Sequence, residues 1–261
     1  MDNRYGFETT SFALGGLNIR SYKSILNQLK TLGFNAIRIP FSNQMLSISA
    51  TINKDINYKV NPDLANLTPL GVLDKIIGYA GSIGLRIMLD RHSAKGGNFA
   101  SECQVYISGD STYTLNRYIS DWVMLAKRYA KSAVIAADLW NEPHQTQTGV
   151  DCTTWGTGNT KTDYEYIMAT VANAILAANP DWLIVIEGFF GCSVTRWNGI
   201  WWGSDLSCLP YFPIVISDMT KLMYSTHEYS ADVGQLANGV WSTLPWFTEQ
   251  PNFPKYMPII W

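Results

Sequence analysis

Two spacings of apolar residues alternate along the 261-residue chain. Apolar residues three or four positions apart, the spacing of one helix face, predict helices over residues 19–32, 70–80, 112–130 and 162–178. Short runs rich in apolar residues predict strands over residues 35–39, 85–90, 133–139, 182–187 and 222–227. Gly33 and Gly84 follow the first two helices, at positions where helices commonly end. Strands that alternate with helices of this length predict parallel βαβ units and an α/β fold.

Polar and ionisable residues stand at the ends of the predicted strands, and they bear on which α/β fold is formed. They are Arg38, Asp90, His92, Asn141, Glu142, Glu187, His227 and Tyr229. In a (β/α)8 TIM barrel the carboxyl ends of all strands meet on one face, where the active site is built. An open doubly wound sheet would gather such residues at one switch point, and no Gly-x-Gly-x-x-Gly follows a strand here. The pattern therefore favours the barrel, and the missing Gly-x-Ser-x-Gly counts against a serine hydrolase.

Composition narrows the classes of protein further. Charged residues make up 15% and apolar residues 47%, which is typical of one globular domain over residues 1–261. The net charge of -2 includes no basic block, so we expect no nucleic-acid partner. No apolar stretch approaches the roughly 20 residues needed to span a bilayer, so we expect no membrane segment. Some of the ten Trp and fourteen Tyr are expected in the core, but so many Trp suggest flat apolar surfaces that are offered to a ligand.

Four cysteines, Cys103, Cys152, Cys192 and Cys208, lie in loop-like sequence without Cys-x-x-Cys spacing. The absence of that spacing argues against a zinc ribbon or a thioredoxin-type site. Four free thiols are one interpretation. We favour up to two disulfides and a secreted, extracellular protein, with Cys192 and Cys208 as the best single pair. The N-terminus carries no signal peptide, so an export signal is expected outside this sequence.

The stretch DLWNEPH (138–144) concentrates candidate chemistry at the end of one predicted strand. Pro143 cannot extend a strand ladder, so the strand is expected to stop at Glu142. Apolar strand residues and Trp140 are expected to surround Glu142 and to raise its pKa, which suits a general acid. Asn141 can position a substrate hydroxyl beside it. The alternative is a structural glutamate that binds backbone groups, and the other strand-end residues make that alternative less favourable.

Asn141-Glu142-Pro143 after an apolar strand resembles the acid/base signature of glycoside hydrolase family 5, the retaining cellulases and their relatives. Further segments resemble this family in the same order along nearly the whole chain: GFNAIRIPFS (33–42), GLRIMLDRH (84–92), WWGSDL (201–206) and STHEYS (225–230). The resemblance implies an incomplete (β/α)8 barrel with about strands two to six, and hydrolysis of β-1,4 bonds in cellulose or a related β-glucan. It implies a secreted enzyme with a polysaccharide partner, a monomer when complete.

The same resemblance assigns roles to individual residues. Glu142 would be the acid/base, and it would act with a second carboxyl about 5–5.5 Å away in a retaining double displacement. The expected substrate-binding residues are Arg38, His92, Asn141, Trp202, His227 and Tyr229, with Trp202 as a platform for a sugar ring. No cofactor and no metal are implied. A metal site built from Asp90, His92 and His227 is an alternative, although the spacing matches no metalloenzyme motif.

One part of the family pattern is missing. The family's nucleophile is a glutamate in a Gly-Glu-Phe-Gly-like motif on the seventh strand, and this sequence contains no such motif. Because NFPKYMPIIW (252–261) resembles the segment before that strand, we expect the nucleophile beyond Trp261. We expect NRYGFET (3–9) just after a first strand whose body is absent, and this partial chain to be inactive by itself. Glu187 is interpreted as a supporting residue of the fifth strand, and Glu249 lies in a predicted loop.

A second function remains open beside the enzyme. A carbohydrate-binding or inactive relative could use the same Trp-lined cleft without hydrolysis, and the missing nucleophile motif favours that alternative for this polypeptide. The subsite loops that distinguish glucan from mannan or xyloglucan cannot be read from the motifs.

Overall fold

The computed structural model describes residues 12–52, 54–96, 102–144, 152–189 and 202–227. The helices are α1 (Tyr22–Thr31), α2 (Pro69–Ser82), α3 (Leu115–Arg128) and α4 (Tyr164–Ala178). The strands are β1 (Ala36–Ser42), β2 (Arg86–Ser93), β3 (Val134–Asp138), β4 (Leu183–Glu187) and β5 (Leu222–Ser225). Short 3-10 turns occur at Met45–Ser47, Pro62–Leu64 and Met219–Lys221. Every helix and strand predicted from the apolar pattern is present.

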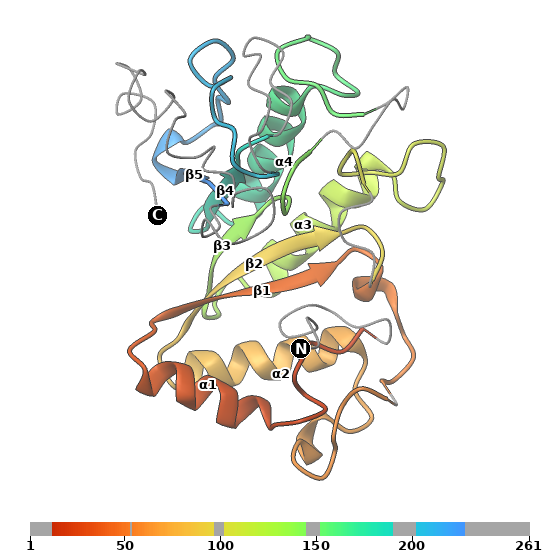
Figure 1. Cartoon of the computed structure of the whole chain (residues 1–261), viewed down its shortest axis with the longest axis vertical. Helices are drawn as coiled ribbons and strands as arrows, with labels where there is room; N and C mark the ends of the chain where they lie inside the picture. The colour runs from red at the N-terminus through yellow and green to blue at the C-terminus, as the bar shows by residue number, and fades with distance from the viewer. Residues whose placement is uncertain (1–11, 53, 97–101, 145–151, 190–201, 228–261) are drawn as a thin grey trace, which may run out of the picture.

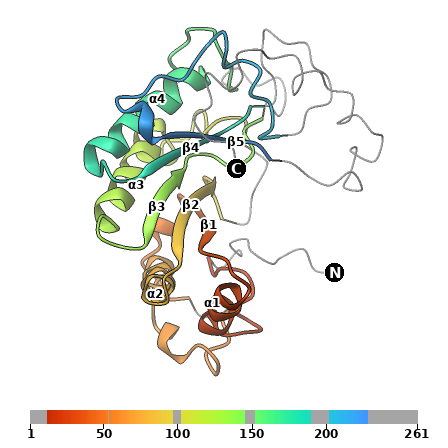
Figure 2. The same cartoon turned by 90° about the vertical axis from the view of Figure 1, so that its left-hand side faces the viewer.

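The five strands form one parallel sheet in the order β1-β2-β3-β4-β5. Spatial order thus follows chain order, without the reversal that defines a doubly wound sheet. Figures 1 and 2 show the sheet as a curved layer, with the helices on its outer side. A curved parallel sheet with helices outside is the geometry of a segment of a β/α barrel. It brings the carboxyl ends of the strands to one face.

Side-chain caps fix where the helices begin. At the N-termini of the four helices, a side-chain oxygen accepts a hydrogen bond from a backbone N–H of the first turn, and the capping residues are Ser21, Thr68, Thr114 and Asp163. Such caps satisfy amides that have no partner within the helix. Gly33 follows α1 with φ at +93°, a left-handed conformation that glycine adopts without a steric penalty. The polar residues between the apolar runs therefore define the element boundaries.

The core lies between the helices and the sheet. Helix α2 presents Val72, Leu73, Ile76 and Ile77 to it, and β2 contributes Ile87 and Leu89. Large aromatic side chains also belong to this core, with at most 2% of their surface exposed: Trp122, Trp140, Trp155 and Trp182. These four are therefore core residues, as expected for some of the aromatic side chains, and not ligand surfaces. Their large apolar area is used in packing.

A disulfide joins Cys103 to Cys152, two cysteines 49 residues apart in the sequence. It links the loop after β2 to the loop after β3, and the amide of Thr153 also donates to the Cys103 carbonyl at 2.8 Å. The four-thiol interpretation is thus wrong. Cys208 is also disulfide-bonded, whereas Cys192, its predicted partner, lies outside the described residues.

We expect replacement of Cys103 and Cys152 by alanine to lower the free energy of unfolding by about 4 kcal/mol. The physical reason is the chain entropy regained by an unfolded loop of this length. Equilibrium urea unfolding of the double variant and the parent measures it. A loss below about 1 kcal/mol would show that the neighbouring backbone contacts already hold the two loops together.

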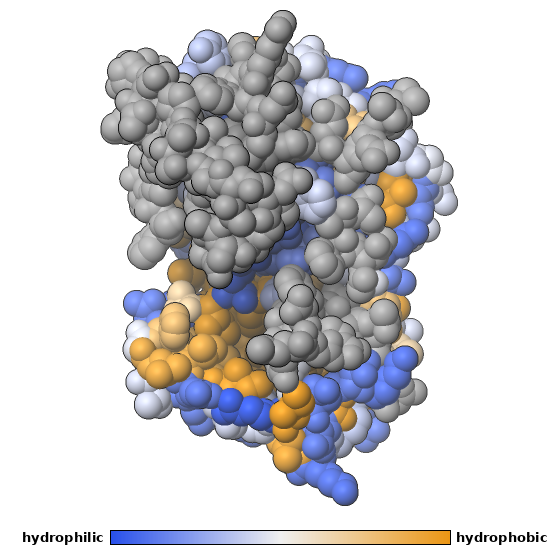
Figure 3. Space-filling model, viewed as in Figure 1, coloured by the Kyte–Doolittle hydropathy of each residue, from blue (hydrophilic) through white to orange (hydrophobic). Residues whose placement is uncertain are grey.

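Within the described ranges, no helix combines the length and the apolar character that crossing a bilayer requires. Apolar surface is nevertheless visible over α1 and the turn into β1 (Figure 3). Leu32 and Phe34 in that turn are 65% and 53% exposed.

Candidate active site

Strand register places a set of polar side chains on one face of the sheet. Asp90 on β2 pairs with Asp138 on β3, and Pro40 on β1 pairs with Asp90. Because side chains alternate along a strand, Arg38 and Pro40 share a face, as do Asp90 and His92. Arg91 points to the opposite face, where its guanidinium lies 5.3 Å from the Tyr118 ring on α3. The alternation therefore separates two groups of charged residues that are adjacent in sequence.

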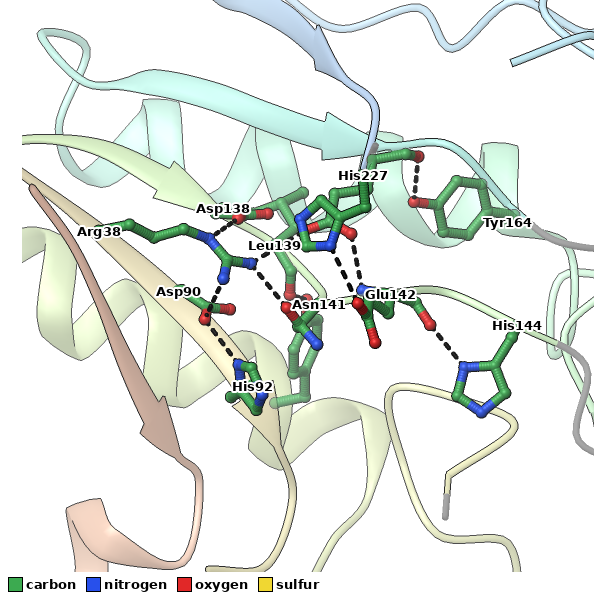
Figure 4. Close-up of polar contacts among 12 residues, drawn as sticks. Arg38, Asp90, His92, Asp138, Leu139, Asn141, Glu142, His144, Tyr164 and His227 are labelled. Atoms are coloured by element: carbon green, nitrogen blue, oxygen red, sulfur yellow. Dashed lines mark hydrogen bonds and ion pairs between the residues drawn. The ribbon is translucent and has the colours of Figure 1, made fainter. Parts of the chain in front are cut away.

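Arg38 is the centre of the inner group (Figure 4). Its guanidinium contacts Asp90 Oδ2 at 2.8 Å, Asp138 Oδ2 at 2.7 Å and Glu187 Oε1 at 2.9 Å. It also donates to Asn141 Oδ1 at 2.9 Å. Burial alone would lower the pKa of Arg38, but the three carboxylates raise it above its ordinary value. One cation thus holds three buried carboxyl groups from three strands.

The pKa values of the two aspartates beside Arg38 are shifted in opposite directions. Burial would raise the pKa of Asp90, yet Arg38 and His92 hold it below its ordinary value, and His92 Nδ1 donates to Asp90 Oδ2 at 2.8 Å. Burial raises the pKa of Asp138 well above its ordinary value, and the charges of Glu187 and Asp90 add to this although Arg38 opposes it. Asp138 is therefore the carboxyl of this group whose pKa burial and the neighbouring carboxylates move upward.

The chain turns sharply at Glu142. Strand β3 ends at Asp138, although Leu139 N–H still donates to the Val185 carbonyl and Asn141 N–H to the Arg91 carbonyl, both at 3.1 Å. Glu142 itself has φ at +49°, in the left-handed region that a glutamate seldom adopts. Its N–H donates to Glu187 Oε2 at 2.6 Å. The expectation that the strand continues to Glu142 is therefore wrong, since a left-handed residue cannot extend a ladder.

His227 lies between two glutamates. Its Nδ1 is 3.2 Å from Glu142 Oε1, and its Nε2 is 2.9 Å from Glu187 Oε1. Burial lowers the pKa of His227, but the hydrogen bonds to Glu142 and Glu187 outweigh this and raise it to about 10. At neutral pH His227 is therefore an imidazolium that donates to both carboxylates.

The charged neighbour changes the expected environment of Glu142. The sequence suggested apolar surroundings that include Trp140, but that ring is buried and packs against Tyr164, with ring centroids 6.3 Å apart. Among the described residues His227 contacts the Glu142 carboxyl, and a cation in that position favours the ionised form of a carboxyl group.

The pH dependence of stability should show the His227 contribution. The folded pKa of about 10 lies above the ordinary value of 6.5, so this contribution is fully present below pH 6.5 and is lost as pH rises through 10. We expect unfolding free energy to fall between pH 7 and pH 10, and to fall less steeply in His227→Gln. Urea unfolding across this range measures it. Equal slopes in the two proteins would contradict a protonated His227.

Trp202 is partly exposed, and its ring stacks on His144, for which no role was predicted. Its ring lies 3.9 Å from that of His144 between centroids, at an interplanar angle of 11°. His144 is buried, and its Nδ1 donates to the Glu142 carbonyl at 2.5 Å. One ring face of Trp202 is therefore covered by His144.

The structure brings most of the predicted site residues into one network. Arg38, Asn141, Glu142 and His227 are linked by direct contacts, and His92 joins them through Asp90. Tyr229 lies outside the described residues. Among the residues that are described, no cluster of His, Cys, Asp and Glu side chains could hold a metal ion. Sequence reasoning gave no site role to Asp138, His144 or Gly203; the polar Asp138 at the end of an apolar strand was the available signal.

Comparison with known proteins places this network in a family. Residues 3–252 match the model of the cellulases, glycosyl hydrolase family 5. An endoglucanase from Paenibacillus polymyxa is 39% identical over 99% of this chain and 60% of its own length. The major extracellular endoglucanase of Xanthomonas campestris pv. campestris is 35% identical over 99% of this chain and 49% of its own length. This chain thus spans 60% and 49% of the length of these two relatives.

Solved structures agree with the sequence match. An endocellulase variant from Pyrococcus horikoshii in complex with cellotetraose superposes with a TM-score of 0.82 at 32% identity, over 98% of this chain and 72% of that one. The predicted barrel class is therefore confirmed: the five parallel strands are a segment of the (β/α)8 barrel of these cellulases. The chain belongs to glycosyl hydrolase family 5.

Proposed function

We propose that the protein is an endo-β-1,4-glucanase that hydrolyses cellulose or a related β-glucan with retention, with Glu142 as its acid/base. The observation that carries this proposal is the position of Glu142 at the carboxyl ends of the strands, where His227 and Glu187 fix its carboxyl and its amide. Active sites of β/α barrels are built at this face. The cellotetraose bound by the related endocellulase supports a β-glucan as substrate.

Glu142 needs two protonation states in this mechanism. In the first step its carboxyl group protonates the leaving glycosidic oxygen, and in the second it takes a proton from the water that releases the sugar. His227 favours the ionised form that the second step needs. We propose that the nucleophilic carboxylate, about 5–5.5 Å away, favours the protonated form for the first step, because two nearby negative charges repel each other.

Glu187 is a poor candidate for that nucleophile. Its side chain is fully buried, and its oxygens accept from Arg38, His227 and the Glu142 amide. A carboxylate held by three donors and shielded from solvent cannot approach a sugar carbon. We therefore assign it a supporting role, and we propose that the nucleophile lies beyond Trp261, as the resemblance implies.

The other predicted residues are proposed to hold this arrangement and to bind the sugar. Arg38 orients Asn141 and Glu187, and Asn141 in turn offers its amide nitrogen to a substrate hydroxyl. His92 and Tyr229 are proposed to line the same site. Trp202 retains only the ring face opposite His144 for stacking on a sugar. The mechanism requires no metal and no organic cofactor.

We propose that the protein is secreted and monomeric when complete. The Cys103–Cys152 disulfide supports an oxidising compartment, and one relative is an extracellular endoglucanase.

Activity on carboxymethyl-cellulose tests the proposal. We would assay residues 1–261 beside a form extended along the reading frame through the next Gly-Glu pair. Activity confined to the extended form is expected, because paired catalytic carboxyls act as a unit. Equal turnover by both forms would place the nucleophile within residues 1–261. Binding of cellotetraose without turnover by either form would favour the non-hydrolytic alternative.

A further inference from the structure

The segment Trp202–Ser204 lies between the Glu142 turn and His227, and it bonds to both. Gly203 N–H donates to the Pro143 carbonyl at 3.4 Å, and the Gly203 carbonyl accepts from His227 N–H at 3.3 Å. Ser204 Oγ also donates to the His227 carbonyl at 2.5 Å. The segment therefore connects the residues on either side of the Glu142–His227 contact.

Gly203 has no room for a side chain. A Cβ atom there would lie 2.6 Å from Glu187 Oε2, 3.2 Å from Glu142 Cα and 3.4 Å from His227 Cβ. Glu187 Oε2 is the atom that accepts the Glu142 amide, and the other oxygen of this carboxyl is held by Arg38 and His227. The carboxyl group thus cannot retreat without breaking one of these contacts. Gly203 also has φ at +77°, where a side chain is strained.

The same segment carries Trp202. Its ring stacks on His144, and His144 donates to the Glu142 carbonyl. A sugar that packs against Trp202 would therefore contact a segment that is joined to the Glu142 turn at two points. These are the Gly203 N–H bond to the Pro143 carbonyl and the stacking of Trp202 on His144.

We propose that Gly203 is a positioning residue. Because Gly203 has no side chain, the Trp202–Ser204 segment can pack closely enough to hold Glu142, Glu187 and His227 in their observed positions. The segment thereby links the sugar platform, Trp202, to the acid/base, Glu142. This inference rests on the proposed function of Glu142. It assigns Gly203 no contact with the reacting atoms.

Gly203→Ala tests the inference against Gly109→Ala. Gly109 has the same left-handed backbone, with φ at +76°, but no atom of the described residues, its chain neighbours aside, lies within 4 Å of its added Cβ. In the active, extended protein we expect Gly203→Ala to lower kcat about 100-fold with little change in KM, since a small displacement of a catalytic group has that effect. Gly109→Ala should keep the parent's kcat.

A spectroscopic readout separates positioning from general destabilisation. The chain has three histidines, so ring NMR signals can be assigned with single variants. In Gly203→Ala we expect the pKa of His227 to fall toward its ordinary value as Glu187 is displaced. An unchanged His227 titration together with unchanged kcat would overturn the inference.

Ser204→Ala covers the case in which Gly203→Ala does not fold. It removes one hydrogen bond to His227 and adds no atom, and we expect about a 10-fold loss of kcat with an altered His227 titration. Parent values for both would overturn the inference. The NMR result is independent of catalysis: if the parent itself proves unable to hydrolyse glucan, the proposed function fails, and the His227 titration still decides whether Gly203 sets this geometry.

Discussion

Glu142→Gln should reduce cellulose hydrolysis by the active protein about 1,000-fold. Glutamine has nearly the shape of glutamate but can neither donate a proton to the leaving oxygen nor take one from water, and general acid–base catalysis contributes about 100- to 10,000-fold. The fold should survive, because the Glu142 contacts that shape the turn use its backbone N–H and carbonyl. Initial rates on carboxymethyl-cellulose and the unfolding midpoint together measure the effect.

Glu165→Gln is the matched control. Glu165 lies in the first turn of α4, where its amide donates to the capping Asp163. The same change of charge there should leave the rate within about twofold, since surface substitutions of this kind have small effects. Full activity in Glu142→Gln would remove Glu142 from the chemistry, whatever its position.

Arg38→Met should unfold or nearly unfold the domain. Methionine keeps an unbranched apolar stem like that of arginine but leaves Asp90 and Glu187, both fully buried, without their shared cation. Breaking a buried ion pair by removing one partner costs about 3–5 kcal/mol, a large share of the stability of a typical domain. Urea unfolding at pH 7 measures the loss.

Arg128→Met separates this effect from the loss of any arginine. Arg128 also binds a carboxylate with two contacts, to Asp74 at 2.8 and 2.5 Å, but at the surface. Exposed pairs contribute about 0–1 kcal/mol, so this variant should stay close to the parent. Acidification should narrow the gap between Arg38→Met and the parent, because protonation removes the uncompensated negative charges. A loss below about 1 kcal/mol in Arg38→Met would show that water or neighbouring residues replace the guanidinium.

The polar ends of the strands could be predicted from the sequence because strand periodicity is local. Asn141, Glu142 and His227 each follow an apolar run, and parallel strands bring such ends to one face. Arg38 instead lies inside β1 (Ala36–Ser42), so its predicted place at a strand end is wrong, although its side chain reaches Glu187 at the same face. The order and type of the helices and strands could be predicted for the same reason, because the spacing of apolar residues is local. The helix starts at Ser21, Thr68, Thr114 and Asp163 depend on neighbouring side chains and are equally local.

The features of the site that could not be predicted from the sequence depend on contacts between distant segments. The Cys103–Cys152 pair joins two loops whose path no periodicity reveals. The charge beside Glu142 comes from His227, 85 residues away, and it replaces the apolar environment expected from Trp140. Composition also did not identify which tryptophans are buried, such as Trp122 and Trp182, because it does not distinguish packing from binding.

The role of Glu142 is tested most directly by the dependence of its effect on the leaving group. The measurement is kcat/KM of the active protein and of its Glu142→Gln variant on aryl β-cellobiosides whose phenols span a wide range of pKa. A good leaving group departs without a proton, whereas a poor one needs general acid assistance. The ratio of parent to variant should therefore rise steadily with the pKa of the phenol. A ratio that stays constant across the series would contradict proton donation by Glu142.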